Sequence, residues 1–197
     1  MTKLVSILIR AFWQPGLKER TIGGYHLTSL LGGGEYGICM VAEKGGRRYC
    51  MKMQYGNTDL GLSFWRRTKK EYEALRKMET SGFTPKPIEM VLTPWVSYLV
   101  TELVEGGRDL GAVGGFEKEE YVRALEAAAP LFAQESPMWH QDMHLGNLVW
   151  DGNKVWLVDW GAAVDKNEVS SFDLREHANR IAQWECRLAW AKSKSKV

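Results

Sequence analysis

The sequence predicts an α+β fold in two lobes, a β-rich first lobe followed by a smaller and mostly helical second one. Short apolar runs bounded by glycine and proline fill most of residues 25–104, a pattern that is typical of strands. Apolar residues at spacings of three and four dominate longer segments further along, which is typical of amphipathic helices. We therefore expect one bilobal domain with lobes at 1–104 and 105–197.

Five strands are expected in the first lobe. Runs at 25–31, 38–43 and 47–54 are separated by glycine-rich turns, which predicts a three-stranded antiparallel meander. Two further apolar runs follow at 88–92 and 95–104, the second ending in a glycine pair as a strand does when it enters a loop.

Three helices complete the expected elements. Residues 64–78 place apolar side chains three and four positions apart among many charges, which predicts the single helix of the first lobe. Residues 117–134 have an alanine-rich helical face, and a final helix is expected over 173–190. Between these two helices, an Asp-Gly pair within 147–158 predicts a β-hairpin.

Composition excludes several classes of protein. With 45% hydrophobic and 25% charged residues, the 197-residue chain resembles an average globular protein rather than a disordered one. The net charge of +2 gives no broad nucleic-acid footprint, and no run approaches the roughly 20 apolar residues that would span a membrane. Cys39, Cys50 and Cys186 are odd in number and lack CxxC spacing, so we expect a reducing, cytoplasmic setting.

The strongest functional signal is a polar loop that reads His140-x-Asp142-x-His144-x-Gly-Asn147. A predicted hairpin follows the loop, and Asp159-Trp-Gly follows the hairpin. Phosphoryl transfer requires a carboxylate at the acceptor hydroxyl and hard oxygen ligands for magnesium, and two acids and an amide at this spacing could supply them.

This pattern resembles the protein-kinase-like superfamily, in the form of its RIO, lipopolysaccharide-kinase and aminoglycoside-phosphotransferase branches, over roughly residues 25–175. The resemblance implies a kinase-like fold and an ATP- and Mg²⁺-dependent phosphotransferase. It implies that Asp142 is the catalytic carboxylate, that Asn147 and Asp159 bind the metal, and that His140 braces the loop.

A glycine-rich segment precedes this loop in the chain. Gly32, Gly33, Gly34 and Gly37 fit G-x-G-x-x-G between two predicted strands, where missing side chains allow backbone amides to approach a phosphate. A dinucleotide-binding fold would need these glycines to open a helix, and a strand-like run follows instead, so the kinase type of loop is preferred. A glycine-rich hairpin turn is the remaining alternative.

Lys52 lies in the third predicted strand, where alternation points it away from its two methionine neighbours. The resemblance implies that this lysine binds the α- and β-phosphates of ATP and pairs with a helix glutamate. Glu71 is preferred over Glu73, because Glu71 shares a helix face with Leu75. An exposed lysine and a solvated helix face are the alternative interpretation.

Residues 98–104 resemble the hinge between the lobes of a kinase. In that interpretation Thr101 is the gatekeeper, and Glu102 and Val104 offer backbone groups to adenine. A buried edge of the sheet would have the same composition, so both interpretations stay open here.

Three other residues take expected roles from the resemblance. Cys39 stands where the family usually has valine, and it should still cover the adenine face. His144 is expected to be structural or to face the acceptor rather than to bind metal. Asp173 resembles the aspartate that opens a buried helix and anchors the catalytic loop.

Three functions remain open. The second lobe lacks an activation segment with its closing Ala-Pro-Glu motif, so acceptor recognition is expected to depend on few elements or on an activating partner protein. The preferred function is a serine/threonine protein kinase. The alternatives are a kinase for a small hydroxylated acceptor, such as a sugar, lipopolysaccharide or antibiotic, and a nucleotide-binding regulatory pseudokinase.

Overall fold

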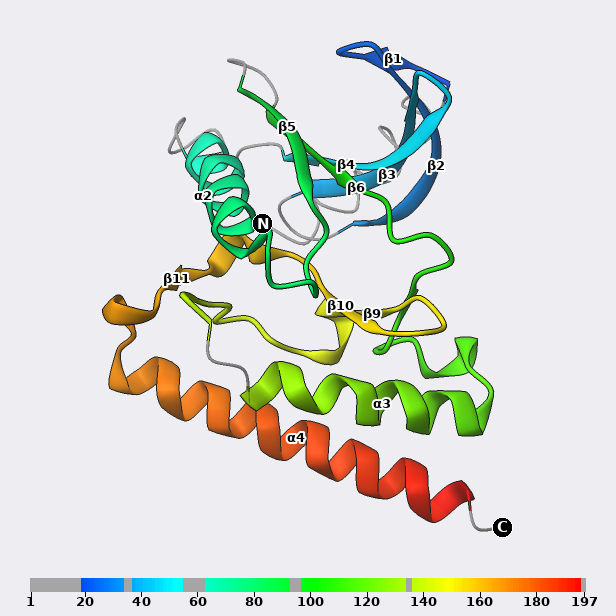
Figure 1. The fold of residues 1–197 in the computed structure, drawn as a ribbon, viewed down its shortest axis with the longest axis vertical. Helices are drawn as coiled ribbons and strands as arrows, with labels where there is room; N and C mark the ends of the chain where they lie inside the picture. Colours follow the sequence, from blue (N-terminus) through cyan, green and yellow to red (C-terminus); the bar gives the residue numbers. More distant parts are fainter. Residues whose placement is uncertain (1–18, 34–36, 55–62, 93–96, 134–135, 196–197) are drawn as a thin grey trace, which may run out of the picture. The chain divides into compact units, whose positions relative to one another are not determined.

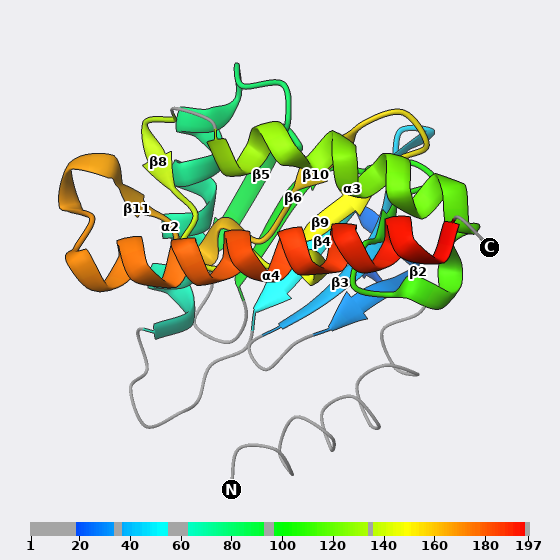
Figure 2. The ribbon, with the colours of Figure 1, turned by 90° about the horizontal axis from the view of Figure 1, so that it is seen from below.

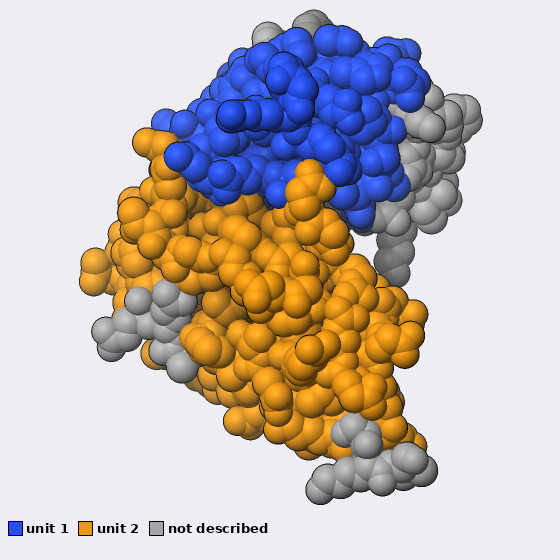
Figure 3. Space-filling model, turned by 45° about the vertical axis from the view of Figure 1, so that its right-hand side comes forward, with its two compact units in different colours: residues 1–72, 86–103 blue, residues 73–85, 104–197 orange. Residues whose placement is uncertain are grey.

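The computed structural model describes residues 19–33, 37–54, 63–92, 97–133 and 136–195. The chain divides into two compact units (Figure 3): unit 1 contains residues 1–72 and 86–103, and unit 2 contains residues 73–85 and 104–197. The predicted α+β class is confirmed. The assignment of ATP binding to residues 1–104 and of catalysis to residues 105–197 stays a prediction.

Unit 1 is built on an antiparallel sheet of six strands, one more than the five predicted. The strands are β1 (Thr21–Ile22), β2 (Tyr25–Gly33), β3 (Gly37–Lys44), β4 (Arg47–Gln54), β5 (Pro87–Leu92) and β6 (Ser97–Glu102). They lie in the order β1-β2-β3-β4-β6-β5 (Figure 1). The additional strand, β1, has two residues and is too short to show the alternation by which the other strands are predicted.

The two faces of this sheet differ in chemistry. One face carries a buried apolar cluster that consists of Tyr25, Leu27, Ile38, Met40, Ala42, Met51, Met53, Tyr98 and Val100. Strand register places Lys52 opposite Cys39 on one neighbour and opposite Leu99 on the other. Because side chains alternate along a strand, Lys52 points to the face opposite the apolar cluster, as predicted.

Helix α2 (Ser63–Met78) confirms the predicted helix to within one residue. Its buried positions include Thr68, Glu71, Leu75 and Met78, which recur at spacings of three and four. The division into units falls within this helix, so that residues 63–72 count with unit 1 and the last turns with unit 2.

Unit 2 combines short strands with two long helices. Its elements are β7 (Arg108–Asp109), α3 (Lys118–Ala133), β8 (Met138–Trp139), β9 (Leu148–Trp150), β10 (Val155–Leu157), β11 (Val164–Asp165) and α4 (Ser171–Ser195). Strands β9 and β10 form the predicted hairpin, and β7 pairs with its outer edge. The Asp151 carboxylate closes the turn by accepting the N–H groups of Asn153 and Lys154, both at 2.8 Å.

Helices α3 and α4 lie side by side (Figures 1 and 2). The rings of Phe132 and Trp184 stack with centroids 5.1 Å apart, and the Trp184 indole N–H donates to the Leu125 carbonyl at 3.0 Å. Helix α4 extends beyond the predicted range of 173–190 at both ends. Within the described residues, no helix has both the length and the apolar character that crossing a membrane requires.

Candidate active site

The residues predicted for the site fall into two groups, one in each unit. Unit 1 contains Gly32, Gly33, Gly37, Lys52, Glu71 and Glu102, whereas unit 2 contains Val104, Asp142, Asn147 and Asp159. Gly34 lies outside the described residues.

Lys52 and Glu71 form a close ion pair in unit 1. The Lys52 ammonium lies 3.0 Å from Oε1 and 2.8 Å from Oε2 of Glu71, and the two side chains are 16% and 4% exposed. Glu73, the competing glutamate, is exposed. The expected partner of Lys52 is therefore present, and removing either charge would leave the other one buried.

A buried chain of polar side chains supports Glu71. The Gln54 amide donates to Glu71 Oε2 at 3.1 Å, and the Thr68 hydroxyl donates to Gln54 Oε1 at 3.0 Å. The Thr68 and Ser97 hydroxyls lie 2.7 Å apart, and since Thr68 has used its single proton, Ser97 donates. This network joins β4 and β6 to α2, and sequence reasoning missed it because isolated polar residues in a strand give no signal.

Two cysteine thiols lie on the same face of the sheet as Lys52. Cys39 and Cys50 are hydrogen-bonded to each other. The bond from Cys39, and then the Lys52 charge, lower the pKa of Cys50 against the opposing effect of burial. The pKa of Cys39 is raised by the same bond and by burial.

The structure explains why residue 37 is glycine but not why residue 32 is glycine. A Cβ on Gly37 would lie 2.6 Å from the Met53 carbonyl oxygen, so the close approach of β3 and β4 requires glycine there. A Cβ on Gly32 would meet no described atom within 4 Å, and its φ is not left-handed. Packing and backbone conformation therefore leave Gly32 unexplained, whereas the approach of a phosphate would explain it.

The predicted hinge residues use their backbone groups within the protein. The Glu102 N–H donates to the Lys86 carbonyl at 2.9 Å, and the Thr101 hydroxyl donates to the Glu102 carbonyl at 3.1 Å. The Val104 carbonyl accepts the Gly107 N–H at 3.1 Å. Each carbonyl keeps a second lone pair, and adenine binding by these residues stays a prediction.

Hydrogen bonds join the predicted catalytic loop in unit 2 to the segment that ends at Asp159. His140 Nε2 lies 2.9 Å from the Val158 carbonyl oxygen, and the Val158 N–H donates to the Asn147 carbonyl at 3.0 Å. The Asn147 side-chain amide then donates to the Asp142 carbonyl at 2.8 Å. The structure thereby brings together the three residues predicted to orient the acceptor and to bind the metal.

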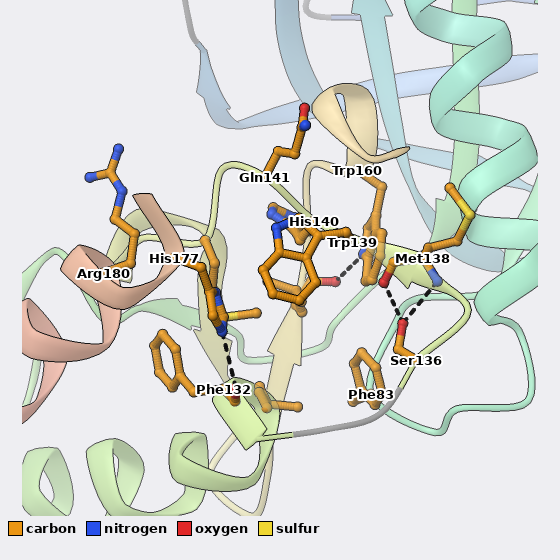
Figure 4. A pocket seen from close by; sticks show the side chains of 13 residues that line it. Phe83, Phe132, Ser136, Met138, Trp139, His140, Gln141, Trp160, His177 and Arg180 are labelled. Atoms are coloured by element: carbon orange, nitrogen blue, oxygen red, sulfur yellow. Dashed lines mark hydrogen bonds between the residues drawn. The ribbon is translucent and has the colours of Figure 1, made fainter. Parts of the chain in front are cut away.

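His140 is held as a neutral ring. It is 4% exposed, and burial lowers its pKa to about 4, although the Val158 carbonyl and the charges of Asp159 and Asp142 oppose this shift. Its ring meets Trp160 edge to face with centroids 4.8 Å apart (Figure 4). Nδ1 is buried with no hydrogen-bond partner among the described residues, which fits a ring whose proton is on Nε2.

Two residues of this region have left-handed backbones. Gln141 has φ 58°, and Asp159 has φ 62° with ψ 63°. Non-glycine residues in this conformation cost about 1–3 kcal/mol and concentrate at functional sites. Gln141 lines the same pocket as His140 (Figure 4).

His144 lies beside the Asp142 side chain. Its Nε2 lies 3.7 Å from Asp142 Oδ2, while its Nδ1 accepts the Gly146 N–H at 3.0 Å. Since Nδ1 is the acceptor, the proton of a neutral ring is on Nε2 and faces the carboxylate. A Cβ on Gly146 would lie 3.0 Å from this ring, so glycine leaves the space that the ring occupies.

Comparison with known protein families decides the family. The model of one family, described as the RIO domain, matches residues 43–184, which is most of the chain. The chain belongs to the RIO domain family. RIO domains are atypical, protein-kinase-like proteins that bind ATP, usually with Mg²⁺, so the resemblance to the protein-kinase-like superfamily is confirmed. No curated protein matched the sequence.

The matched range of the RIO domain contains Lys52, Glu71, Asp142, Asn147 and Asp159. It begins after the glycine-rich segment, so the phosphate-binding role of Gly32, Gly33, Gly34 and Gly37 stays a prediction. The match also extends nine residues beyond the predicted limit of 175, into α4.

The donor atoms of this RIO domain suit magnesium. Asn147 uses its amide nitrogen toward Asp142, which leaves Oδ1 as the atom available to a cation, and Asp159 supplies a carboxylate. Mg²⁺ prefers hard oxygen ligands and is usually held by one or two carboxylates together with phosphates and water. Asn147 and Asp159 would therefore hold the ion.

Asp173 has a different place in this RIO domain from the one expected. Its carboxylate accepts the Ser170 N–H at 2.8 Å and the Ser170 hydroxyl at 2.6 Å, which caps the start of α4. The neighbouring Leu174 is 53% exposed. The start of α4 is thus exposed rather than buried, and the hydrogen bonds recorded for Asp173 go to Ser170 rather than to the catalytic loop.

Proposed function

We propose that this RIO-domain protein is a serine/threonine protein kinase that transfers the γ-phosphoryl group of ATP to a hydroxyl with the help of Mg²⁺. One observation carries the proposal: the hydrogen bonds from His140 through Val158 and Asn147 to Asp142 join the segments that carry the predicted base and the predicted metal ligands.

In this proposal each residue has a defined task. Asp142, which lies beside His144, accepts a hydrogen bond from the acceptor hydroxyl and takes its proton as the bond from that oxygen to the γ-phosphorus forms, while the bond from this phosphorus to the β–γ bridging oxygen breaks and ADP leaves. Lys52, fixed by Glu71, binds phosphate oxygens. Asn147 and Asp159 hold Mg²⁺, which when bound neutralises charge on the triphosphate.

A small hydroxylated acceptor is the second candidate. The sequence His140-x-Asp142-x-His144-x-Gly-Asn147 has the form found in aminoglycoside phosphotransferases, and the same residues would serve a sugar or antibiotic hydroxyl. In that case ATP consumption should rise with the soluble acceptor rather than with protein.

The deciding experiment incubates the protein with γ-labelled ATP and Mg²⁺ and follows label in the protein, in added protein substrates and in free phosphate. Asp142→Asn should lower the rate of transfer by about 10²–10⁴-fold, the contribution of a general base, and leave ATP affinity largely intact. Glu119→Gln is the control, because Glu119 is exposed on α3. Unchanged transfer in Asp142→Asn would refute the mechanism, and ATP binding without transfer to any acceptor would indicate a pseudokinase.

A further inference from the structure

A second concave surface of unit 2 lies beside the predicted catalytic loop. It is an open groove of about 1080 Å³ between the loop residues 143–146 and one face of α4. We call it the α4 groove. Nine α4 residues line the groove, and five of them recur along the helix at spacings of three and four: Glu176, Arg180, Gln183, Arg187 and Trp190.

The dimensions of the α4 groove fit an extended chain. Glu176 and Trp190 are separated by 14 positions, which is about 21 Å along a helix axis. About six residues of extended peptide cover that distance. The volume lies at the upper end of the roughly 300–1,000 Å³ that is common for sites of small ligands, so the groove has room for a short extended peptide.

The charge of the α4 groove favours an acidic occupant. Within the described residues, the half-buried Arg180 has no hydrogen bond, ion pair or ring contact. The other half-buried cations of unit 2 have partners, which are Glu120 for Arg108, the Gly82 carbonyl and the Trp156 ring for Lys154, and the Trp190 ring for Arg187. Figure 4 shows the Arg180 side chain extending from α4 away from Phe132. The Arg180 guanidinium is therefore available to pair with a carboxylate of a bound molecule.

Glu176 and Trp190 also determine what the α4 groove can bind beside Arg180. Glu176 lies one helical turn before Arg180 and also lines the groove, but it is not within ion-pair distance of Arg180. At the other end, Trp190 is 46% exposed and offers an aromatic surface. An occupant with a carboxylate near Arg180 and an apolar side chain near Trp190 would match both.

The groove also reaches the reacting group. His144 lines it, and His144 Nε2 lies 3.7 Å from Asp142 Oδ2. A chain in the groove that contacts His144 therefore comes within one side chain of the carboxylate that is predicted to receive the acceptor hydroxyl.

We propose that the α4 groove binds the acceptor segment of a protein substrate as an extended peptide, with an aspartate or glutamate side chain paired with Arg180. This inference rests on the proposed function and specifies its substrate class, namely serine or threonine in an acidic sequence. The pairing would use bidentate hydrogen bonds from the guanidinium to the carboxylate.

The test measures direct binding of two seven-residue peptides to the full chain by isothermal titration, without nucleotide. Both peptides contain one serine, and they differ only in having two glutamates or two glutamines. The glutamate peptide should bind about tenfold more tightly, as a hydrogen-bonded ion pair allows. Arg180→Met should abolish this preference, Arg180→Lys should restore part of it, and Glu176→Gln should increase it.

Arg175→Met is the matched control, because Arg175 is exposed on α4 and does not line the groove. Trp190→Ala should weaken both peptides alike. Equal binding of the two peptides, or a preference that persists in Arg180→Met, would overturn the proposal. So would an RNA oligomer that binds in an Arg180-dependent way more tightly than the glutamate peptide.

Phosphorylation assays with the same peptides separate the two proposals. If label is transferred to protein but the glutamate preference is missing, the proposed function stands and the groove proposal fails. If the preference is present but no transfer occurs, the proposed function fails and the groove remains a peptide-binding site. With both intact, Arg180→Met should raise KM for the glutamate peptide and leave kcat unchanged.

Discussion

His140 joins the two segments of the candidate site in unit 2. Its ring binds the carbonyl that precedes Asp159, and its backbone carbonyl accepts the N–H of Asp142 at 2.7 Å. A charged ring in this buried place would be costly, so His140 makes the stability of the protein depend on pH.

We expect the free energy of unfolding to fall as pH is lowered from 6.5 toward 4. The unfolded His140 binds a proton near pH 6.5, whereas the folded residue does so only near pH 4. The unfolded state binds more protons in this interval, so acidification destabilises the fold, by about 3 kcal/mol for the whole interval. Urea unfolding at several pH values measures this slope.

The variant His140→Gln should flatten that slope, because glutamine keeps a donor for the Val158 carbonyl and does not titrate. Asn179→Gln, an exposed and non-titrating change on α4, should keep the slope of the natural protein. An unchanged slope in His140→Gln would show that other groups cause the acid sensitivity.

Element α2 is attached to its sheet by polar contacts as well as by packing. Thr68 and Ser97 are fully buried, and together with Gln54 they connect the helix to β4 and β6 at the level of Glu71. The position of Glu71, and through it that of Lys52, therefore depends on side chains that carry no charge.

Thr68→Val should destabilise the protein by about 1–3 kcal/mol, because it leaves buried polar groups of Gln54 and Ser97 without their partner. Thermal or urea unfolding measures the loss. Thr80→Val is the control, because it makes the same substitution at an exposed turn position. A Thr68→Val variant as stable as the control would mean that the network adds nothing to stability.

The glycine-rich segment allows a test by paired substitutions. Gly37→Ala should destabilise unit 1, because its Cβ would clash with the Met53 carbonyl. Gly32→Ala should fold with unchanged stability, since no described atom lies within 4 Å of its Cβ, and should weaken ATP binding if the backbone approaches phosphate there. Unfolding midpoints and ATP titration give the two results, and unchanged ATP affinity in Gly32→Ala would contradict the phosphate-binding role.

Periodic elements could be predicted from the sequence, and short or irregular ones could not. Alternation and helical spacing gave β2 to β6, α2 and α3 with small errors at their ends. The two-residue strands β1, β7, β8 and β11 are set by distant partners, and two residues cannot show a period. The loop residues were predicted from their motif, whereas neither a motif nor a period marks the supporting Gln54, Thr68 and Ser97.

For the whole molecule, the predicted tasks are divided between the two units. Lys52 and Glu71 belong to unit 1, and Asp142 belongs to unit 2. Variants of Lys52 or Glu71 should therefore affect nucleotide binding, and variants of Asp142 should affect phosphoryl transfer.

Lys52→Met alone should destabilise the protein by about 3–5 kcal/mol, because it removes the cation that faces the buried Glu71 carboxylate. The double variant Lys52→Met/Glu71→Gln should recover part of this stability but still bind ATP at least tenfold more weakly, whereas Asp142→Asn should bind ATP as the natural protein does. Titration calorimetry with Mg-ATP compares them. Full ATP affinity in the double variant would contradict the role of Lys52.

The hydrogen-bonded thiols of Cys39 and Cys50 in unit 1 provide a site for covalent labelling. The hydrogen bond from Cys39 and the Lys52 charge lower the pKa of Cys50. A larger fraction of Cys50 than of an ordinary cysteine is therefore thiolate at neutral pH, and the thiolate is the form that reacts with electrophiles. An alkylating reagent should therefore modify Cys50 before Cys39. Since both thiols share a sheet face with Lys52, bound nucleotide should slow the labelling, so that mass spectrometry of one cysteine would report occupancy without any measurement of catalysis.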